Sequence, residues 1–122
     1  MSMRFLQDGN GVVLHKAFCA GGAKVPGVEL MEAKVAGEGE GKHVPVVEVE
    51  GSLVTVRVGE VQHPMDDGHF IAFIALQTSE GDQIVRLQPG QEPKAVFALA
   101  PDAKPLAAYE YCTKHGLWKV EL

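Results

Sequence analysis

Hydrophobic and polar residues alternate over short stretches in the second two-thirds of the chain. Within residues 44–50, Val47 and Val49 fall on one face and Glu48 and Glu50 on the other, and residues 53–58 alternate in the same way. A period of two places successive side chains on opposite faces of a β-strand. Between these stretches, Gly51-Ser52 has the length and the leading glycine of a two-residue hairpin turn. The pattern therefore predicts a β-hairpin.

Further strands are predicted toward the C-terminus, separated by turns rich in glycine, proline and aspartate. They cover residues 69–77, 83–87, 94–100, 106–112 and 117–121. About seven short strands spaced roughly 8–12 residues apart are typical of a β-sandwich. Only residues 28–35 have a weak helical pattern. The expected fold class is therefore all-β.

The N-terminal third of the chain has a different pattern. Residues 1–36 are glycine-rich and less regular, and glycine and glutamate alternate from Gly37 to Gly41. Such a run is expected to be a flexible link or a mobile loop. We therefore predict a small N-terminal lobe over residues 1–36 and a β-sandwich domain over residues 37–122.

Composition and charge exclude several classes of protein. The chain has 122 residues and a net charge of −5, which argues against binding to nucleic acid. Its longest apolar run, residues 70–76, is too short to span a membrane, and its first residues show no apolar signal segment. Cys19 and Cys112 form no Cys-x-x-Cys pair. Two isolated thiols indicate a reducing compartment, so the cytoplasm is the expected location.

Four of the five histidines lie at strand ends or in neighbouring loops, and one cysteine ends a strand. These residues are His43, His63, His69, His115 and Cys112. Loops gather at the two ends of a sandwich, so side chains from several loops can meet at one point. His63 and His69 flank a tight Pro-Met-Asp-Asp-Gly loop, and two residues separate Cys112 from His115. Nitrogen and sulfur donors at such spacings indicate a transition-metal site.

Each of these residues also has an ordinary interpretation. A single histidine at a strand end is more often a hydrogen-bonded surface or core residue, and a single cysteine is more often a small buried hydrophobe. The joint pattern favours a metal. Five donors exceed the four of structural zinc, and calcium and magnesium prefer oxygen ligands. Iron favours six ligands, which leaves one position for a substrate, and a thiolate pushes electron density through the metal.

Three segments resemble the superoxide reductase family, also called desulfoferrodoxin or neelaredoxin. They are Lys42-His43-Val44-Pro45, His63-Pro64-Met65 through His69-Phe70-Ile71, and Tyr111-Cys112-Thr113-Lys114-His115-Gly116-Leu117-Trp118. Motif order and spacing match the family from about Lys42 to the C-terminus. The resemblance implies an immunoglobulin-like β-sandwich with one iron per chain, ferrous or ferric. It also implies four equatorial ligands and one axial ligand: His43, His63, His69 and His115, with Cys112 axial.

The resemblance also implies a reaction. The family reduces superoxide to hydrogen peroxide with one electron and two protons, and its usual electron donor is rubredoxin or a related small iron protein. Lys42 matches the family's catalytic lysine, whose charge attracts superoxide, although an isolated lysine is more often a solvated surface residue. Many members place a glutamate directly before this lysine. Here that residue is Gly41, with Glu40 one step earlier.

Longer members of the family carry a desulforedoxin-like lobe with a four-cysteine iron site. Residues 4–34 resemble that lobe in length and in their glycines, but they contain only Cys19. Because that iron site needs four thiolates, it cannot form here. We therefore expect a metal-free lobe that serves packing or dimer contacts, in a homodimer or higher homo-oligomer. Trp118 is expected to pack in the sandwich or line the site.

Two other classes of protein remain open. A cupredoxin-like electron-transfer protein also combines a β-sandwich with an early histidine and a late Cys-x-x-His. Against it, no methionine follows His115, and two of the histidines would be surplus. The third possibility is a non-catalytic sandwich with a structural zinc, which would unfold on chelation. Metal content and colour separate the three.

Overall fold

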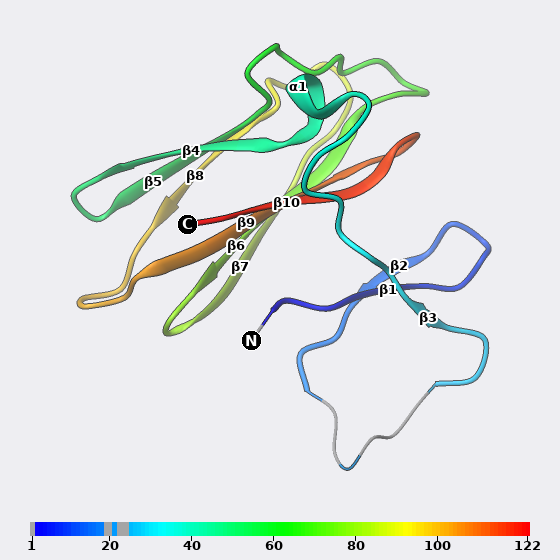
Figure 1. Cartoon of the computed structure of the whole chain (residues 1–122), viewed down its shortest axis with the longest axis horizontal. Coiled ribbons are helices and arrows are strands. Elements are labelled where there is room, and N and C mark those ends of the chain that lie inside the picture. Colours follow the sequence, from blue (N-terminus) through cyan, green and yellow to red (C-terminus); the bar gives the residue numbers. More distant parts are fainter. Residues whose placement is uncertain (1, 19–20, 22–24) are drawn as a thin grey trace. The chain divides into compact units, whose positions relative to one another are not determined.

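The computed structural model describes residues 2–18, 21 and 25–122 (Figure 1). The chain divides into two compact units, Met1–Glu32 and Ala33–Leu122. Cys19 lies outside the described residues. The expected role of the N-terminal lobe, and its metal-free state, stay predictions.

The first unit is a three-stranded antiparallel sheet in the order β2-β1-β3. Its strands are β1 (Phe5–Gln7), β2 (Val13–His15) and β3 (Glu29–Leu30). The short helix that the weak pattern over residues 28–35 allowed is therefore not formed. Glu29 and Leu30 pair with β1 instead, because hydrogen bonding to a neighbouring strand outweighs a weak local preference.

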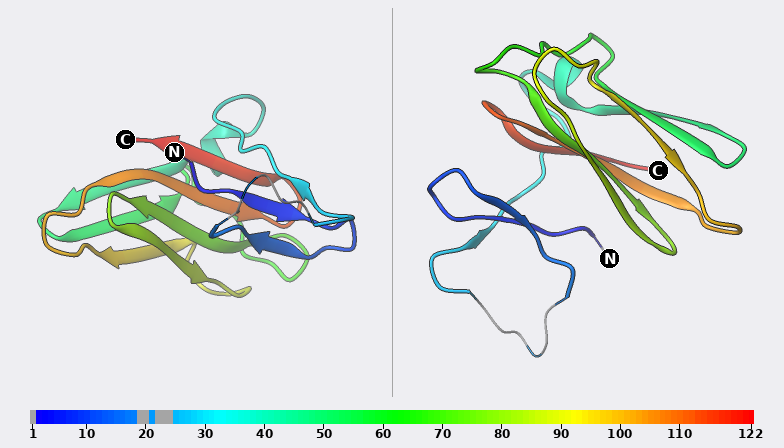
Figure 2. Two further views of the ribbon diagram at one scale, coloured as in Figure 1. Left: turned by 90° about the horizontal axis from the view of Figure 1, so that it is seen from below. Right: turned by 180° about the vertical axis from the view of Figure 1, so that it is seen from behind.

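The second unit is an antiparallel β-sandwich of seven strands (Figures 1 and 2). One sheet has the order β4-β5-β8, and the other has the order β10-β9-β6-β7. The strands of the first sheet are β4 (Pro45–Glu50), β5 (Leu53–Val58) and β8 (Lys94–Ala98). Those of the second are β6 (Ile71–Thr78), β7 (Gly81–Arg86), β9 (Pro105–Cys112) and β10 (Gly116–Glu121). The predicted all-β sandwich is confirmed.

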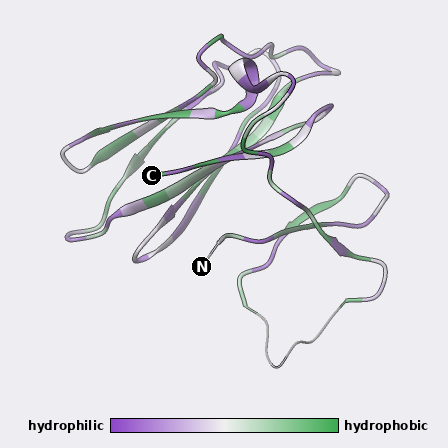
Figure 3. Ribbon diagram, in the orientation of Figure 1, coloured by the Kyte–Doolittle hydropathy of each residue, from purple (hydrophilic) through white to green (hydrophobic). Residues whose placement is uncertain are grey.

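The core lies between these two sheets and follows the alternation seen in the sequence. Every second residue of β5 is buried, namely Val54, Val56 and Val58. They cluster with buried residues of three other strands, among them Ile74, Leu76, Phe97 and Ala108. Hydrophobic segments run along β5, β6 and β9 in Figure 3. Each fully buried valine or leucine stabilises the fold by about 2 kcal/mol.

A single short helix, α1 (Glu40–His43), precedes β4 within the second unit. The sequence analysis expected a flexible link here, and that expectation is wrong for its last residues. Gly39 lies directly before the helix, at its N-cap, with a positive φ of 84°, a conformation that favours glycine. In the described part of the chain, no helix has the length and apolarity needed to cross a membrane.

The backbone near the end of β5 supports α1. The N–H of Val61 donates to the carbonyl of Gly41 at 3.0 Å. Gly59 is tightly apposed to the helix: a Cβ there would lie 2.8 Å from the oxygen of Gly41 and 2.9 Å from the carbonyl carbon of Lys42. Real Cβ atoms essentially never approach backbone so closely. The absence of a side chain at Gly59 therefore lets the end of α1, which carries Lys42 and His43, pack closely against this backbone.

Candidate metal centre

The predicted site residues come from separate segments that meet at one end of the sandwich. His43 ends α1, and His63 and His69 lie in the connection from β5 to β6. Cys112 is the last residue of β9, and His115 lies in the turn before β10. Antiparallel pairing brings the start of β6 and the start of β10 beside Cys112. The strand order therefore gathers the segments that carry the five side chains.

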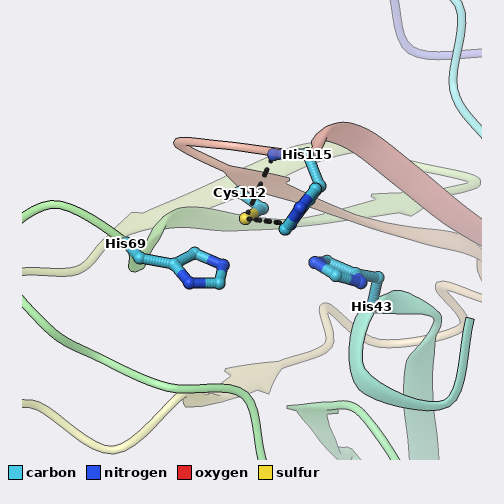
Figure 4. A group of neighbouring side chains, drawn as sticks. All are labelled: His43, His69, Cys112 and His115. Atoms are coloured by element: carbon cyan, nitrogen blue, oxygen red, sulfur yellow. Dashed lines mark hydrogen bonds between the residues drawn. The ribbon is translucent and has the colours of Figure 1, made fainter. Parts of the chain in front are cut away.

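The donor atoms of four of these residues form a compact cluster (Figure 4). One ligand atom from each of His43, His69, Cys112 and His115 lies within 4.8 Å of the others. The fifth, His63, lies beside them: its Nε2 is 3.2 Å from Nε2 of His43, and its ring centroid is 4.8 Å from that of His69. All five predicted residues therefore lie together.

The hydrogen bonds of two imidazoles leave one nitrogen of each of these rings for the cluster. Nδ1 of His43 bonds to the carbonyl of Gly39 at 2.8 Å, and Nδ1 of His63 bonds to the carbonyl of Pro64 at 2.6 Å. A carbonyl can only accept, so both Nδ1 atoms carry the proton and both Nε2 atoms are free to act as donors to a metal.

Two observations test whether a metal fits this donor set. Nε2 of His69 is buried and has no hydrogen-bond partner among the described residues. A buried polar atom without a partner costs free energy, which a bound ion would recover. Nδ1 of His115 lies 3.7 Å from Sγ of Cys112, so this ring turns Nδ1 toward the cluster. Nitrogen and sulfur donors that converge in this way suit a transition metal.

Cys112 is a fully buried thiol at the base of the cluster. Burial raises its pKa, and the backbone N–H groups of Lys114 and His115 partly offset this effect. The N–H of His115 lies 3.4 Å from Sγ. Without a metal, the thiol therefore keeps its proton at neutral pH. Binding of a metal would replace that proton.

Burial also keeps the neighbouring imidazoles neutral. It lowers the pKa of His63 to about 4, against the opposing bond to Pro64, and nearby histidines lower this pKa further. The pKa of His43 is lowered by burial, although its bond to Gly39 opposes this. For His69, burial is followed by the positive charges of His115, Lys114 and Lys42 in lowering the pKa. Neutral imidazoles are the form that a metal requires.

Lys42 and Glu40 lie on α1 beside the cluster. Lys42 is exposed, and after burial and the charges of His115 and Lys114, its positive charge also lowers the pKa of His69. Glu40, in the first turn of α1, lines a groove formed with residues of β4 and β10, among them Val46 and Val120.

Two buried residues complete the surroundings of the cluster. Trp118 stacks on His43, with ring centroids 5.0 Å apart and an interplanar angle of 16°, in agreement with the expectation that it packs in the sandwich or lines the site. Glu110 is fully buried on β9, and neither carboxylate oxygen has a hydrogen-bond partner within the described ranges. Burial raises the pKa of Glu110 well above its usual range. The sequence analysis missed this glutamate, although it lies on the same face of the predicted strand as Cys112.

The antiparallel sandwich, with imidazoles and a buried thiol gathered at one end, places this chain in the class of β-sandwich proteins with a candidate metal site. The model of the desulfoferrodoxin family matches residues 35–121, which is more than half of the chain. The chain therefore belongs to the desulfoferrodoxin family.

Individual relatives and solved structures agree with this assignment. A desulfoferrodoxin homologue of Archaeoglobus fulgidus is 45% identical over 92 residues, covering 75% of this chain and 72% of that protein. A superoxide reductase of Pyrococcus horikoshii is 40% identical over 111 residues, covering 76% and 96% respectively. The crystal structure of the superoxide reductase from Treponema pallidum has a TM-score of 0.82 at 35% identity and covers 98% of both chains.

Proposed function

We propose that this chain is a superoxide reductase, which reduces superoxide to hydrogen peroxide with one electron and two protons. The observation that carries the proposal is the cluster of four imidazoles and one buried thiol at one end of a desulfoferrodoxin-family sandwich. Relatives named superoxide reductase support it. The proposed cofactor is one non-haem iron per chain.

The proposed ligands are Nε2 of His43, His63 and His69, Nδ1 of His115 and Sγ of Cys112. For His43 and His63 the assignment follows from their Nδ1 bonds to carbonyl oxygens. For His69 it follows from the buried Nε2 atom, and for His115 from the position of Nδ1 near sulfur. Five donors exceed the four that structural zinc takes, and they leave room for a substrate at a six-coordinate ion.

The protein's own residues supply binding and charge for the reaction. When iron is bound in its ferrous state, it supplies the electron that reduces superoxide. Lys42 is the proposed catalytic lysine, because it is exposed and its charge reaches the cluster at His69. A local positive charge is needed, since the whole chain has a net charge of −5 and repels anions. Solvent is the proposed source of the two protons.

Metal analysis with a visible spectrum tests the cofactor. We expect about one iron per chain, little colour in the reduced protein and a thiolate-to-ferric absorption band after mild oxidation. A Cys112→Ser variant should lose that band, because the sulfur donor is absent. Copper in place of iron would favour the cupredoxin-like alternative. A protein that takes only zinc, and stays colourless after reconstitution with ferrous iron, would exclude the proposed site.

The location and the electron donor belong to the same proposal. A buried, unbridged thiol at Cys112 suits a reducing compartment, so we place the protein in the cytoplasm. The proposed donor is a rubredoxin-like iron protein, which can be tested by following its oxidation while superoxide is supplied. No transfer of electrons to the oxidised protein would contradict this choice of donor.

A homodimer or higher homo-oligomer is also proposed. The first unit spans only Met1–Glu32, a length at which folding usually needs a metal, disulfides or association. Its Leu14 and Leu30 are 43% and 59% exposed, and both pair with Leu6 across the sheet. Sedimentation of the full chain should give at least a dimer, and Leu14→Asp should shift it toward the monomer. A monomeric wild-type protein would contradict the proposal.

A further inference from the structure

The carbonyl oxygen of His115 accepts two side-chain hydrogen bonds. Nζ of Lys34 donates to it at 3.1 Å, and Nε1 of Trp118 donates to it at 3.1 Å. This carbonyl belongs to the turn between β9 and β10, which contains His115 and directly follows Cys112. The orientation of that turn therefore depends on two donors from outside it.

The backbone of Lys34 is fixed beside β10. Its N–H donates to the carbonyl of Leu117 at 2.9 Å, and its carbonyl accepts from the N–H of Lys119 at 2.9 Å. These bonds form a parallel bridge between Lys34 and Trp118. Because the backbone position is set by two hydrogen bonds, the long side chain begins at a defined place next to the turn.

The ammonium group of Lys34 also lies over the indole ring of Trp118, 5.3 Å from its centroid. Trp118 is 1% exposed and stacks on His43, as described above. A cation placed over an aromatic face is attracted to the ring. Lys34 thus touches the turn that contains one proposed ligand and directly follows another, and the ring that stacks on a third.

We propose that Lys34 is a positioning residue of the metal centre, which orients the Cys112–His115 turn and the Trp118 ring so that the proposed ligands converge. The inference rests on the proposed function. Lys34 lies outside the segments that resemble the family motifs, and it does not itself offer a ligand atom. Partners of metal ligands typically change metal affinity about 10–100-fold when they are mutated. Since Lys34 is exposed, we expect an effect near the lower end.

Three variants separate this role from a general effect of charge. Lys34→Met keeps most of the side-chain length but removes the charge and the donor. Lys34→Arg keeps both, since a guanidinium group also donates to carbonyls and stacks on aromatic rings. Lys104→Met removes the same charge at the start of β9, the end of the strand opposite Cys112, where the N–H of Lys104 bonds to Ser79. The readouts are ferrous-iron affinity, by anaerobic competition with a chelator, and the energy of the thiolate-to-ferric band after oxidation.

Lys34→Met should raise the dissociation constant for ferrous iron about tenfold and shift the thiolate-to-ferric band. Lys34→Arg should keep most of the wild-type iron affinity and band energy, and Lys104→Met should match the wild type in both. Equal affinity and an unshifted band in Lys34→Met would overturn the inference. So would a lower melting midpoint of the metal-free Lys34→Met protein with unchanged iron affinity. If the wild type itself binds no iron, the proposed function fails, which is a separate result.

Discussion

The Nδ1 atoms of three imidazoles of the cluster have different neighbours. His43 and His63 use Nδ1 to bond to a neighbouring carbonyl, whereas Nδ1 of His115 lies near the sulfur of Cys112. These contacts set the orientation of these three rings before any metal binds. At the scale of single residues, the site is therefore largely organised by local backbone carbonyls and by burial.

The charge of Lys42 should affect the rate of reaction with superoxide and not the iron content. Lys42→Ala is expected to slow the second-order reaction at low salt about tenfold, because local positive charge concentrates an anionic substrate. The difference should shrink as ionic strength rises. Lys104→Ala is the matched control, since it removes one lysine at the other end of β9. Equal rates for Lys42→Ala and the control would contradict the proposed role.

The burial of His63 should make the metal-free protein sensitive to acid. Its pKa is lowered from 6.5 to about 4 in the folded chain, so the unfolded chain binds more protons between these values. The contribution of His63 to the free energy of unfolding is therefore fully present above about pH 6.5 and is lost as the pH falls toward 4. The expected loss is on the order of 3 kcal/mol.

Urea denaturation of the metal-free protein at pH 7.5 and pH 4.5 measures this loss, with His63→Gln as the reference. The stability advantage of the wild type over His63→Gln should shrink at the lower pH, because glutamine does not titrate. An advantage that stays the same at both pH values would show that the histidine titrates normally in the folded chain.

Glu110 should have the opposite dependence on pH. Burial raises its pKa in the folded chain, so the folded chain binds more protons than the unfolded chain above the usual pKa of a glutamate. Its contribution is therefore greatest at low pH and is lost as the pH rises. Glutamine does not titrate, so Glu110→Gln removes this loss. The free energy of unfolding of the variant should therefore rise relative to that of the wild type by about 1.4 kcal/mol per pH unit, until the carboxyl of the folded wild type ionises. Thermal or urea unfolding at pH 4 and pH 8 tests it, and a constant difference would contradict it.

At the scale of elements, alternation with a period of two predicted the sandwich strands, because each strand has one face in the core. The bounds of β5 agree with the prediction, and β4, β6 and β10 differ from it by one or two residues. Two local expectations were wrong for one physical reason. Residues 28–35 pair with other segments, and α1 is supported by a glycine some 20 residues further along the chain. Such contacts leave no periodic pattern.

More of the candidate site than of the short elements around it could be predicted from the sequence. Motif spacing predicted the five clustered residues, since strand ends of a sandwich gather in space. Lys42 came from the family resemblance. Lys34 and Glu110 show what spacing does not reveal. The bond from Lys34 to His115 joins residues 81 positions apart, and Glu110 breaks the usual rule that carboxylates stay in water.

The packing of α1 on Gly59 gives a prediction at this scale. Gly59→Ala would place a Cβ against the backbone of Gly41 and Lys42, so the helix that carries Lys42 and His43 must shift. Overpacking of this kind costs about 1–3 kcal/mol. We expect a lower melting midpoint and weaker binding of iron.

Gly68→Ala is the control for this substitution. Gly68 lies in the same connection between β5 and β6, and a Cβ there meets nothing within 4 Å. It should therefore leave both the melting midpoint and iron binding close to the wild type. If Gly59→Ala behaves like Gly68→Ala, the close approach of α1 has no energetic importance.

At the scale of the whole sandwich unit, the proposed ligands come from both sheets. One residue separates His43 from β4 of one sheet, whereas Cys112 ends β9 in the other. The connection that carries His63 and His69 joins the two sheets. A metal bound to these residues would therefore link the two layers of the sandwich.

Removal of the metal should accordingly destabilise the unit as a whole. A ligand at 100 times its dissociation constant stabilises the folded state by about 2.7 kcal/mol, which raises the melting midpoint by roughly 10 °C in a domain of this size. Calorimetry of iron-loaded and chelator-treated protein measures the difference. For Cys112→Ser, the difference between the melting midpoints with and without iron should be smaller. Identical midpoints with and without iron would contradict a site that links the two sheets.

The stoichiometry of a single turnover tests the central claim most directly. The iron-loaded, reduced protein is mixed with a smaller amount of superoxide under anaerobic conditions, and hydrogen peroxide, oxygen and ferric protein are measured. We predict one hydrogen peroxide and one ferric centre for each superoxide consumed, with no oxygen released. One hydrogen peroxide for every two superoxide molecules, with oxygen released and the iron still ferrous, would show dismutation and contradict the proposed function.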